Sequence, residues 1–543
     1  MVGTFRLPSG TTTAPPAGPT ATPWVRPADW LAMPTPGAQE VIGLLAIYED
    51  ANYIAVQCQG PYTVDWGDGT VTNYNINVNA SKTYDFSSIP AGTTTSEGFR
   101  QVIVRITPQA GQNLTSVAFA VQNTTYAKNG YSTGWLDIEV KMPNGTPFFN
   151  GHTNIVRYHR LQRLVITDIA LGSLMGNLCN SMLALRSFSI GPTKTATTTN
   201  FVSMFGNCLS IEEVPLFDTS SGTGFNSMFS GCTNLRVVPQ YNFQNATSFD
   251  STFYLCRSLT TVPLFNIGNA TKVMSNMFNE CTSLTSIPLI NTTGTTNMAN
   301  MFTACRSLTT IPLLNLSSCT NTNSMFSTCQ SLSSIPLLDT SKVVNMSNMF
   351  VTCQALRTIP LLDTSKNLTF NSFFSTCTAL ETIPLINTEL GTDFNSMFTG
   401  CPALQEVPLL NTGSASTFNA MFNGCNSLQA VPAFNTAKVA TFNNAFNNCL
   451  GLRELPALNM SAGTSFTTFI GGNVSIGKST AFGARFAHSY TNMALVQAEI
   501  VNIFTNLGTA SGAQAITVSS NPGYAGLTTG ERAIATGKGW TIA

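Results

Sequence analysis

MFSTCQSLSSIPLLDT, starting at Met325, and two near-copies, MFVTCQALRTIPLLDT from Met349 and MFTGCPALQEVPLLNT from Met397, decide the fold. The copies differ mainly at polar positions, while the apolar positions hold. Their cysteines belong to a column of eleven that recurs every 24 residues, with one 25-residue step. The column consists of Cys208, Cys232, Cys256, Cys281, Cys305, Cys329, Cys353, Cys377, Cys401, Cys425 and Cys449. A strict period of this length predicts stacked coils, that is, a solenoid.

Apolar residues recur at fixed offsets from each cysteine, which is counted as position zero. Offsets −7, −4, −3 and zero are mostly apolar and trace one face of a helix. Offset +3 is Leu or Ile, +6 is Ile, Val or Leu, and +8 is mostly Leu, a spacing that approaches the two-residue alternation of a strand with its inner face buried. We therefore expect an α/β solenoid of 24-residue coils. Proline at +7 in every copy has no N–H for a sheet ladder, so the stacked sheet should be narrow or interrupted there.

The repeat resembles a known family. BspA-like leucine-rich repeats read roughly MFxxCxxLxxIPxxDTSxVTxMxxMF, and Asp339 to Val343, followed by Met346 and by Met349-Phe350, matches this pattern residue for residue. The resemblance covers about residues 171–472, although most copies carry Asn-Thr in place of Asp-Thr. Bacterial members are typically surface proteins and adhesins, so the resemblance implies binding rather than catalysis.

Strand-like segments precede the repeats. VIGLLAIYE, YIAVQC, YTVDWGDGTV and FRQVIVRIT, separated by polar turns, predict an all-β immunoglobulin-like sandwich over residues 39–112. VDWGDGT at 64–70 and the later KTYDF resemble the PKD-like domain, whose members are spacers and docking modules. The clustered Asp65, Asp68 and Asp85 could suggest calcium. A hairpin with Gly-Asp-Gly at its tip needs such residues for turn geometry alone, and we favour that interpretation.

Residues 1–38 are rich in Pro, Thr, Ala and Gly. They are either a flexible tail or an extended docking arm that orders on a partner, with Trp24, Trp30 and Leu31 as anchors.

Two further units enclose the repeats. Residues 113–170 are the expected N-terminal cap of the solenoid at 171–472, and residues 473–543 are the expected C-terminal α/β cap. The stretch 493–508 predicts an amphipathic helix with Leu495, Ile500, Ile503, Phe504 and Leu507 on one side. The ending ATGKGW at 535–540 resembles the end of phage-encoded BspA-like proteins.

Fourteen cysteines invite a disulfide interpretation, and coils stacked at ~4.8 Å would bring neighbouring cysteines within bridging distance. One cysteine per coil at an interior position is also what a small buried apolar residue looks like, and we favour that role. Cys58 and Cys319 lie outside the column. Zinc is disfavoured because the paired C-x-x-C arrangement is missing.

Composition narrows the function. Charged residues make up 9% of the chain, and Lys+Arg and Asp+Glu balance at 25 each, so nucleic acid is an unexpected partner. No apolar run approaches the ~18–20 residues of a membrane span. The three histidines, His152, His159 and His488, lie outside any nucleophile motif, and neither a phosphate loop nor a carboxylate pair is recognisable. We expect no enzyme activity, no cofactor and no metal.

These observations predict a bacteriophage virion structural protein that is assembled in the host cytoplasm. The start MVGTFRLPSG lacks the apolar core of a secretory signal, which disfavours an exported adhesin. The arm and the PKD-like domain would dock on other virion proteins, and the solenoid would project as a tail fibre or other appendage that binds a host-surface glycan or protein. The alternatives are a capsid decoration protein that binds only virion subunits and a cellular surface adhesin. A homo-oligomer is compatible with each of these.

Overall fold

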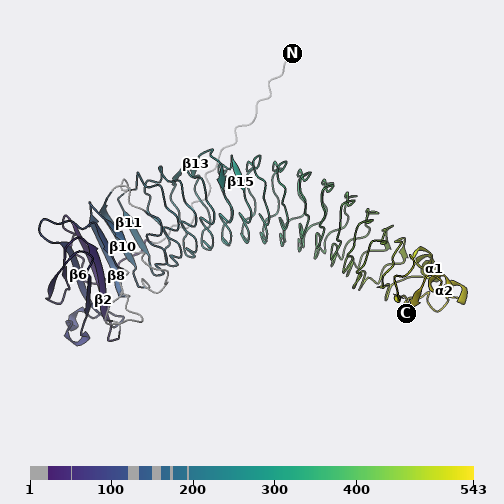
Figure 1. Ribbon diagram of the computed structural model, residues 1–543, viewed down its shortest axis with the longest axis horizontal. Coiled ribbons are helices and arrows are strands. Elements are labelled where there is room, and N and C mark those ends of the chain that lie inside the picture. Colours follow the sequence, from purple (N-terminus) through teal and green to yellow (C-terminus); the bar gives the residue numbers. More distant parts are fainter. Residues whose placement is uncertain (1–22, 51, 120–133, 149–159, 171–174, 192–194) are drawn as a thin grey trace, which may run out of the picture.

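The computed structural model describes residues 23–50, 52–119, 134–148, 160–170, 175–191 and 195–543. The stack of coils curves into an arch (Figure 1). Strands of an N-terminal sheet region lie at one end of the arch, and helices α1 (Gln497–Asn506) and α2 (Thr529–Thr536) lie at the other. The prediction of a stacked solenoid is confirmed.

Two sheets form the N-terminal end. The larger has the strand order β11-β10-β8-β1-β6-β3-β4, and the smaller has the order β5-β2-β7-β9. The strands are β1 (Glu40–Ile47), β2 (Tyr53–Gln59), β3 (Tyr62–Asp65), β4 (Val71–Tyr74), β5 (Asn79–Thr83), β6 (Arg100–Pro108), β7 (Ser116–Ala118), β8 (Trp135–Met142), β9 (Thr146–Phe148), β10 (Arg163–Ile169) and β11 (Ser187–Ile190). Two short 3-10 turns, η1 (Phe86–Ser88) and η2 (Ala91–Thr93), precede β6. Leu45 from β1 and Val56 from β2 belong to one hydrophobic core, so the two sheets bury their apolar side chains together.

The larger sheet continues into the solenoid. Its strand β8 is antiparallel to β1 on one side and parallel to β10 on the other, and β10 pairs in parallel with β11. The boundary predicted at residue 112 therefore falls inside one sheet, because β8, from the predicted cap segment, lies beside β1. Buried residues of this sheet and of the first coils also share one core. The sheet region thus closes the N-terminal end of the solenoid interior.

The segment before each cysteine is not helical. Residues 195–496 contain no helix, and in each coil offsets −5 and −1 have left-handed backbone, as in Ser324 (φ 54°). Alternate N–H groups consequently point along the stack. Phe326 donates to the carbonyl of Met349 in the next coil at 3.0 Å, whereas Cys329 donates to Phe326 within its own coil at 3.1 Å. The α/β description of the coil was wrong, because a left-handed residue every four positions interrupts the hydrogen bonds that a helix requires.

Strand pairing along the stack is narrow. Short parallel ladders form between β12 (Asn242–Phe243) and β13 (Asn266–Ile267), between β14 (Lys272–Val273) and β15 (Thr295–Asn297), and between β16 (Glu454–Leu455) and β17 (Lys478–Ser479). Isolated bridges link other coils, for example Glu213 with Val237. The proline at +7 lies between these ladders, in agreement with the interruption that the sequence predicts.

One column that we expected to be buried faces solvent. The residue at offset +8 is exposed and its neighbour at +9 is buried, as shown by Leu361 (60% exposed) and Leu362 (1%). From the cysteine up to offset +9, the buried positions are therefore +3, +6 and +9. The expected strand alternation fails because the chain around the proline is not in an extended ladder, and a three-residue spacing replaces the two-residue one.

The C-terminal region follows the last coil with a three-stranded parallel sheet of β18 (His488–Ser489), β19 (Gln514–Thr517) and β20 (Trp540–Ile542). Helix α1 is shorter than the predicted stretch 493–508, and all five residues assigned to its apolar side are buried. Helix α2 begins with a capping box, in which Thr528 and Glu531 bond each other's backbone N–H. None of the described helices is long and apolar enough to cross a membrane.

Candidate interaction surfaces

Residues 23–33, which belong to the docking arm predicted at 1–38 and are here called the N-terminal arm, pack on the larger sheet. Trp30 is 7% exposed and lies in a small core with Leu44 and Ala46 of β1 and Phe99. Strand β1 is therefore covered on both faces, which explains why its sequence, EVIGLLAI, is almost continuously apolar. The arm is bound to this chain in the structure, and its docking on a partner stays a prediction.

The three predicted anchors differ in accessibility. Trp30 is buried, whereas Trp24 and Leu31 are only partly buried against the same core. The rings of Trp24 and Trp30 are 6.1 Å apart. The backbone N–H of Leu31 donates to Gln101 Oε1 at 2.9 Å, which fixes the arm on β6. Trp24 is the tryptophan that retains accessible surface for another molecule.

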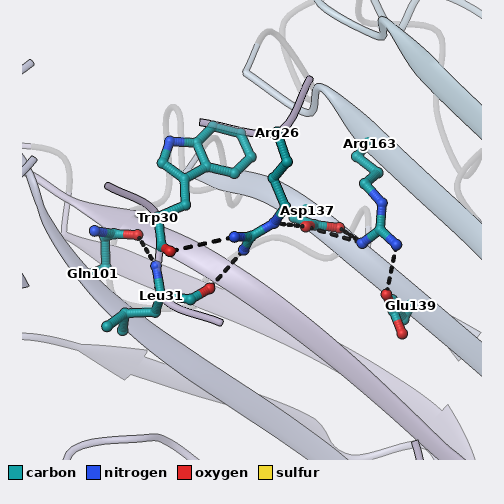
Figure 2. A network of polar contacts seen from close by, with 7 residues as sticks. All are labelled: Arg26, Trp30, Leu31, Gln101, Asp137, Glu139 and Arg163. Carbon is teal, nitrogen blue, oxygen red and sulfur yellow. Dashed lines mark hydrogen bonds and ion pairs between the residues drawn. The ribbon is translucent and has the colours of Figure 1, made fainter. Parts of the chain in front are cut away.

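A charged network fastens the arm (Figure 2). Arg26 Nε donates to Asp137 Oδ2 at 2.8 Å, and its terminal nitrogens donate to the carbonyls of Trp30 (3.3 Å) and Leu31 (2.6 Å). On the other side of Asp137, Arg163 Nη1 donates to Oδ1 at 2.9 Å. The N-terminal arm, strand β8 and strand β10 thus meet at the buried carboxylate of Asp137.

Asp137 is fully buried, so its charge depends on these partners. Arg163 also pairs with Glu139 at 2.8 Å. Burial opposes the charge of Arg163, but Asp137 and Glu139 outweigh that effect and raise its pKa. Sequence reasoning missed this network, since Arg26 and Asp137 are 111 positions apart. An aspartate inside the apolar strand WLDIEV was the available signal.

A pocket of about 340 Å³ lies between the arm and the start of the solenoid. It is lined by Pro23, Trp24, Arg186, Ser187, Phe188, Glu213, Val214 and Pro215. The pocket combines two aromatic residues with one positive and one negative side chain. It lies where the N-terminal arm, strand β11 and the first regular coil meet.

The cysteine column is interior. All fourteen cysteines are free and buried. Each column thiol donates to the carbonyl at offset −3 of the coil before it, as Cys353 does to Phe326 at 3.1 Å, except that Cys208 donates to Cys179. Burial raises the pKa of Cys232, Cys401 and Cys449 to about 12, so these thiols are protonated at neutral pH. They donate hydrogen bonds and pack in the interior, and a protonated thiol is unsuited to nucleophilic chemistry.

A second ladder fixes the other side of the coils. Threonine at offset +11 is buried in seven coils. In six of these coils its hydroxyl donates to the carbonyl at +10 of the next coil, as Thr388 does to Asn411 at 2.7 Å. The donors are Thr219, Thr340, Thr364, Thr388, Thr412 and Thr436. These bonds tie each coil to its successor.

The acidic residues considered for calcium have other partners. Asp68 accepts hydrogen bonds from Thr70 and pairs with Lys82, and Asp85 accepts the N–H of Ser87. Asp65 accepts the N–H of Gly67 in the β3–β4 hairpin. Within the described residues, no three His, Cys, Asp or Glu side chains converge in a way that could hold a metal ion.

Arg160 and the three histidines have separate surroundings or lie outside the described residues. Arg160 lies over the ring of Tyr48, 3.9 Å from its centroid. His152 and His159 lie outside the described residues. Burial lowers the pKa of His488 to about 4, and its ring packs among Phe466, Tyr490 and Trp540. His488 is therefore a neutral core residue at the junction of the solenoid and the C-terminal sheet.

Comparison with known proteins identifies the repeats. The family described as "Mycoplasma protein of unknown function, DUF285" matches residues 175–288, 271–385 and 335–454, which together span just over half of the chain. None of the curated proteins matches the chain.

Several solved structures are similar. A leucine-rich cell surface protein from Faecalibacterium prausnitzii is 16% identical over 69% of this chain and 91% of its own, with a TM-score of 0.31. A leucine-rich repeat protein from Eubacterium ventriosum is 17% identical over 63% of this chain and 90% of its own, with a TM-score of 0.34. A leucine-rich repeat protein from T. pallidum is 19% identical over 31% of this chain and 76% of its own, with a TM-score of 0.24.

Proposed function

This chain belongs to the family described as Mycoplasma protein of unknown function, DUF285, and from that premise we propose that it is a non-enzymatic attachment protein. Its N-terminal region anchors it on a larger assembly, and its repeats meet a target surface. The observation that carries this proposal is the unbroken sheet from β1 through β8 and β10 to β11. A continuous sheet and one shared core hold the repeat array at a fixed angle to the anchor, as an attachment device requires.

A binding role also fits the chemistry of the side chains. The column thiols are buried with raised pKa values, and His488 is buried and neutral. Asp65, Asp68 and Asp85 support turns. Most of these groups are therefore committed to structure, which leaves surface recognition as the role of the repeats.

The assembly that we propose is a bacteriophage virion, with the chain as a tail fibre or other appendage. The N-terminal region would dock on other virion proteins, where Trp24 and the pocket beside it offer a contact. The strands that lie within residues 39–112 of the two N-terminal sheets are the proposed immunoglobulin-like, PKD-like module. Its β3–β4 hairpin and the bond from Tyr84 Oη to the carbonyl of Trp66 (2.8 Å) support that assignment. The neutral Ser, Thr and Asn side chains of the coils suit a host glycan or an uncharged protein surface.

The second candidate is a cellular surface adhesin. The family description names a mycoplasma protein, and this favours a role on a cell over a role that is limited to virions. A capsid decoration protein, which binds only virion subunits, is the third candidate. All three use the same anchored array and differ in what the repeats contact.

Competition tests the attachment role. Purified full chain, added in excess, should reduce adsorption of the particles that carry it to their host cells. A chain lacking residues 1–38 should compete equally well but should no longer incorporate into particles, because the repeats bind the target and the N-terminal region binds the virion. Adsorption unaffected by any excess of the full chain would contradict the proposal. Normal incorporation of the truncated chain would contradict docking through the arm.

A further inference from the structure

Eight leucines at offset +8 form an exposed row along the solenoid, here called the leucine ridge. Their exposed fractions lie between 53% and 63%. The ridge consists of Leu216, Leu264, Leu289, Leu313, Leu337, Leu361, Leu385 and Leu409. Seven of them, from Leu264 to Leu409, occupy consecutive coils. Single exposed apolar residues are normal on protein surfaces, but a continuous row of this kind is not.

The coil does not need leucine at this offset. Gln240, Ala433 and Ala457 stand at the same position in other coils. In two of those coils the interior residues at +9, Tyr241 and Phe434, are as buried as the +9 residues of the coils that carry leucine at +8. Packing therefore leaves offset +8 open to polar or small residues. The leucines at this offset therefore have a role other than packing within the coil.

The ridge is large enough for a stable interface. A leucine that is six-tenths exposed presents on the order of 100 Å², so eight present roughly 800 Å², about the area that each partner contributes to a standard protein interface. The largest apolar patch on a typical monomer is only ~300–600 Å². The exposed area thus meets what a stable dimer requires.

The surroundings of the ridge favour a copy of the same surface over a charged partner. Offset +5, three residues before each leucine, is exposed and neutral in six consecutive coils: Thr261, Ser286, Thr310, Ser334, Thr358 and Thr382. The whole chain has no net charge, so no net electrostatic repulsion opposes the approach of two copies. A row of one residue at a constant spacing also matches itself after a two-fold rotation, which is the symmetry of most homodimers.

We propose that the leucine ridge is an interface between two copies of this chain. The two ridges run antiparallel, and leucines of one copy lie between leucines of the other. The contact is centred on the middle of the consecutive run, near Leu337, where the greatest number of leucines meet.

Sedimentation of the full chain tests this interface. The wild type should dimerise within a range of about 1 to 100 µM, because interfaces of standard size have dissociation constants of micromolar or below. The triple variant Leu313→Gln, Leu337→Gln, Leu361→Gln should raise the dimer dissociation constant at least tenfold. Glutamine already stands at this offset in the wild type, as Gln240, so the variant should fold. A thermal midpoint within a few degrees of wild type would show this.

The matched control changes exposed leucines outside the ridge. Leu368, Leu390 and Leu450 are 53%, 47% and 47% exposed and lie at other offsets. Their triple glutamine variant should dimerise within twofold of wild type. A wild type that stays monomeric throughout the range overturns the proposal, and so does a dimer that the ridge variant weakens no more than the control does. Either result would assign the ridge to another occupant.

Discussion

Replacing Arg26 with alanine should open the N-terminal arm while the solenoid stays folded. The change removes a 2.8 Å ion pair to Asp137 and two hydrogen bonds to the carbonyls of Trp30 and Leu31. Hydrogen bonds to charged groups contribute ~1.5–3 kcal/mol each. The Arg26 side chain is 25% exposed and Asp137 keeps Arg163, so we expect a loss of about 2 kcal/mol, below the ~3–5 kcal/mol for a buried charge left unpaired.

Native-state hydrogen exchange measures this opening directly. The amide of Leu31 donates to Gln101 and exchanges when the arm leaves the sheet. A loss of about 2 kcal/mol corresponds to an exchange rate roughly 30-fold faster in Arg26→Ala. The amide of Phe326, which donates to Met349 inside the solenoid, should keep its wild-type rate.

The control for Arg26 is an exposed ion pair between coils. Arg357 pairs with Glu381 at 3.3 Å and is 74% exposed, so Arg357→Ala should leave both amides unchanged. An increase of less than threefold at Leu31 in Arg26→Ala would show that Arg26 does not hold the arm, which would then be held by its apolar contacts alone.

Three further predictions concern the interior. The stability of the C-terminal sheet should fall by up to about 3 kcal/mol as the pH drops from about 6.5 to 4. The pKa of His488 in the folded state is about 4, so the unfolded chain binds the proton first. The variant His488→Phe should remove this pH dependence, as measured by denaturant midpoints. Cys353→Ala should cost about 1–2 kcal/mol, since it removes the thiol donor to Phe326 and leaves a small cavity, and an unchanged urea midpoint would contradict this role. Thr388→Val should lower the free energy of unfolding by about 1–2 kcal/mol, because it leaves the carbonyl of Asn411 without its donor. The control Thr378→Val removes an exposed hydrogen bond of 3.4 Å and should leave the free energy of unfolding unchanged. Equal losses in the two variants would contradict the threonine ladder.

The repeat period made the stack predictable, because only stacked coils can bury a column of identical residues every 24 positions. The local backbone was less predictable. Offsets −7, −4, −3 and zero share their spacing with a helix face, but left-handed residues produce the same burial through a chain of turns. Glycine at offset −1, as in Gly231, Gly400 and Gly424, was a signal for this backbone.

The exposed leucines show a second limit of periodicity. Leu361 and Leu362 are adjacent and equally apolar, and the sequence pattern alone did not decide which of them points inward. The proline before them breaks the strand that would have fixed the alternation. The charged network around Asp137 could not be predicted from the sequence either, because it joins segments that are far apart in the sequence and depends on how the arm folds over β1.

Imaging of particles labelled with an antibody against the solenoid, scored together with adsorption to host cells, tests whether the repeats bind the host. We expect label on the tail or on protruding fibres, together with blocked adsorption, because the repeats are the proposed surface that meets the host. Unlabelled particles, or a regular pattern over the head with normal adsorption, would contradict it.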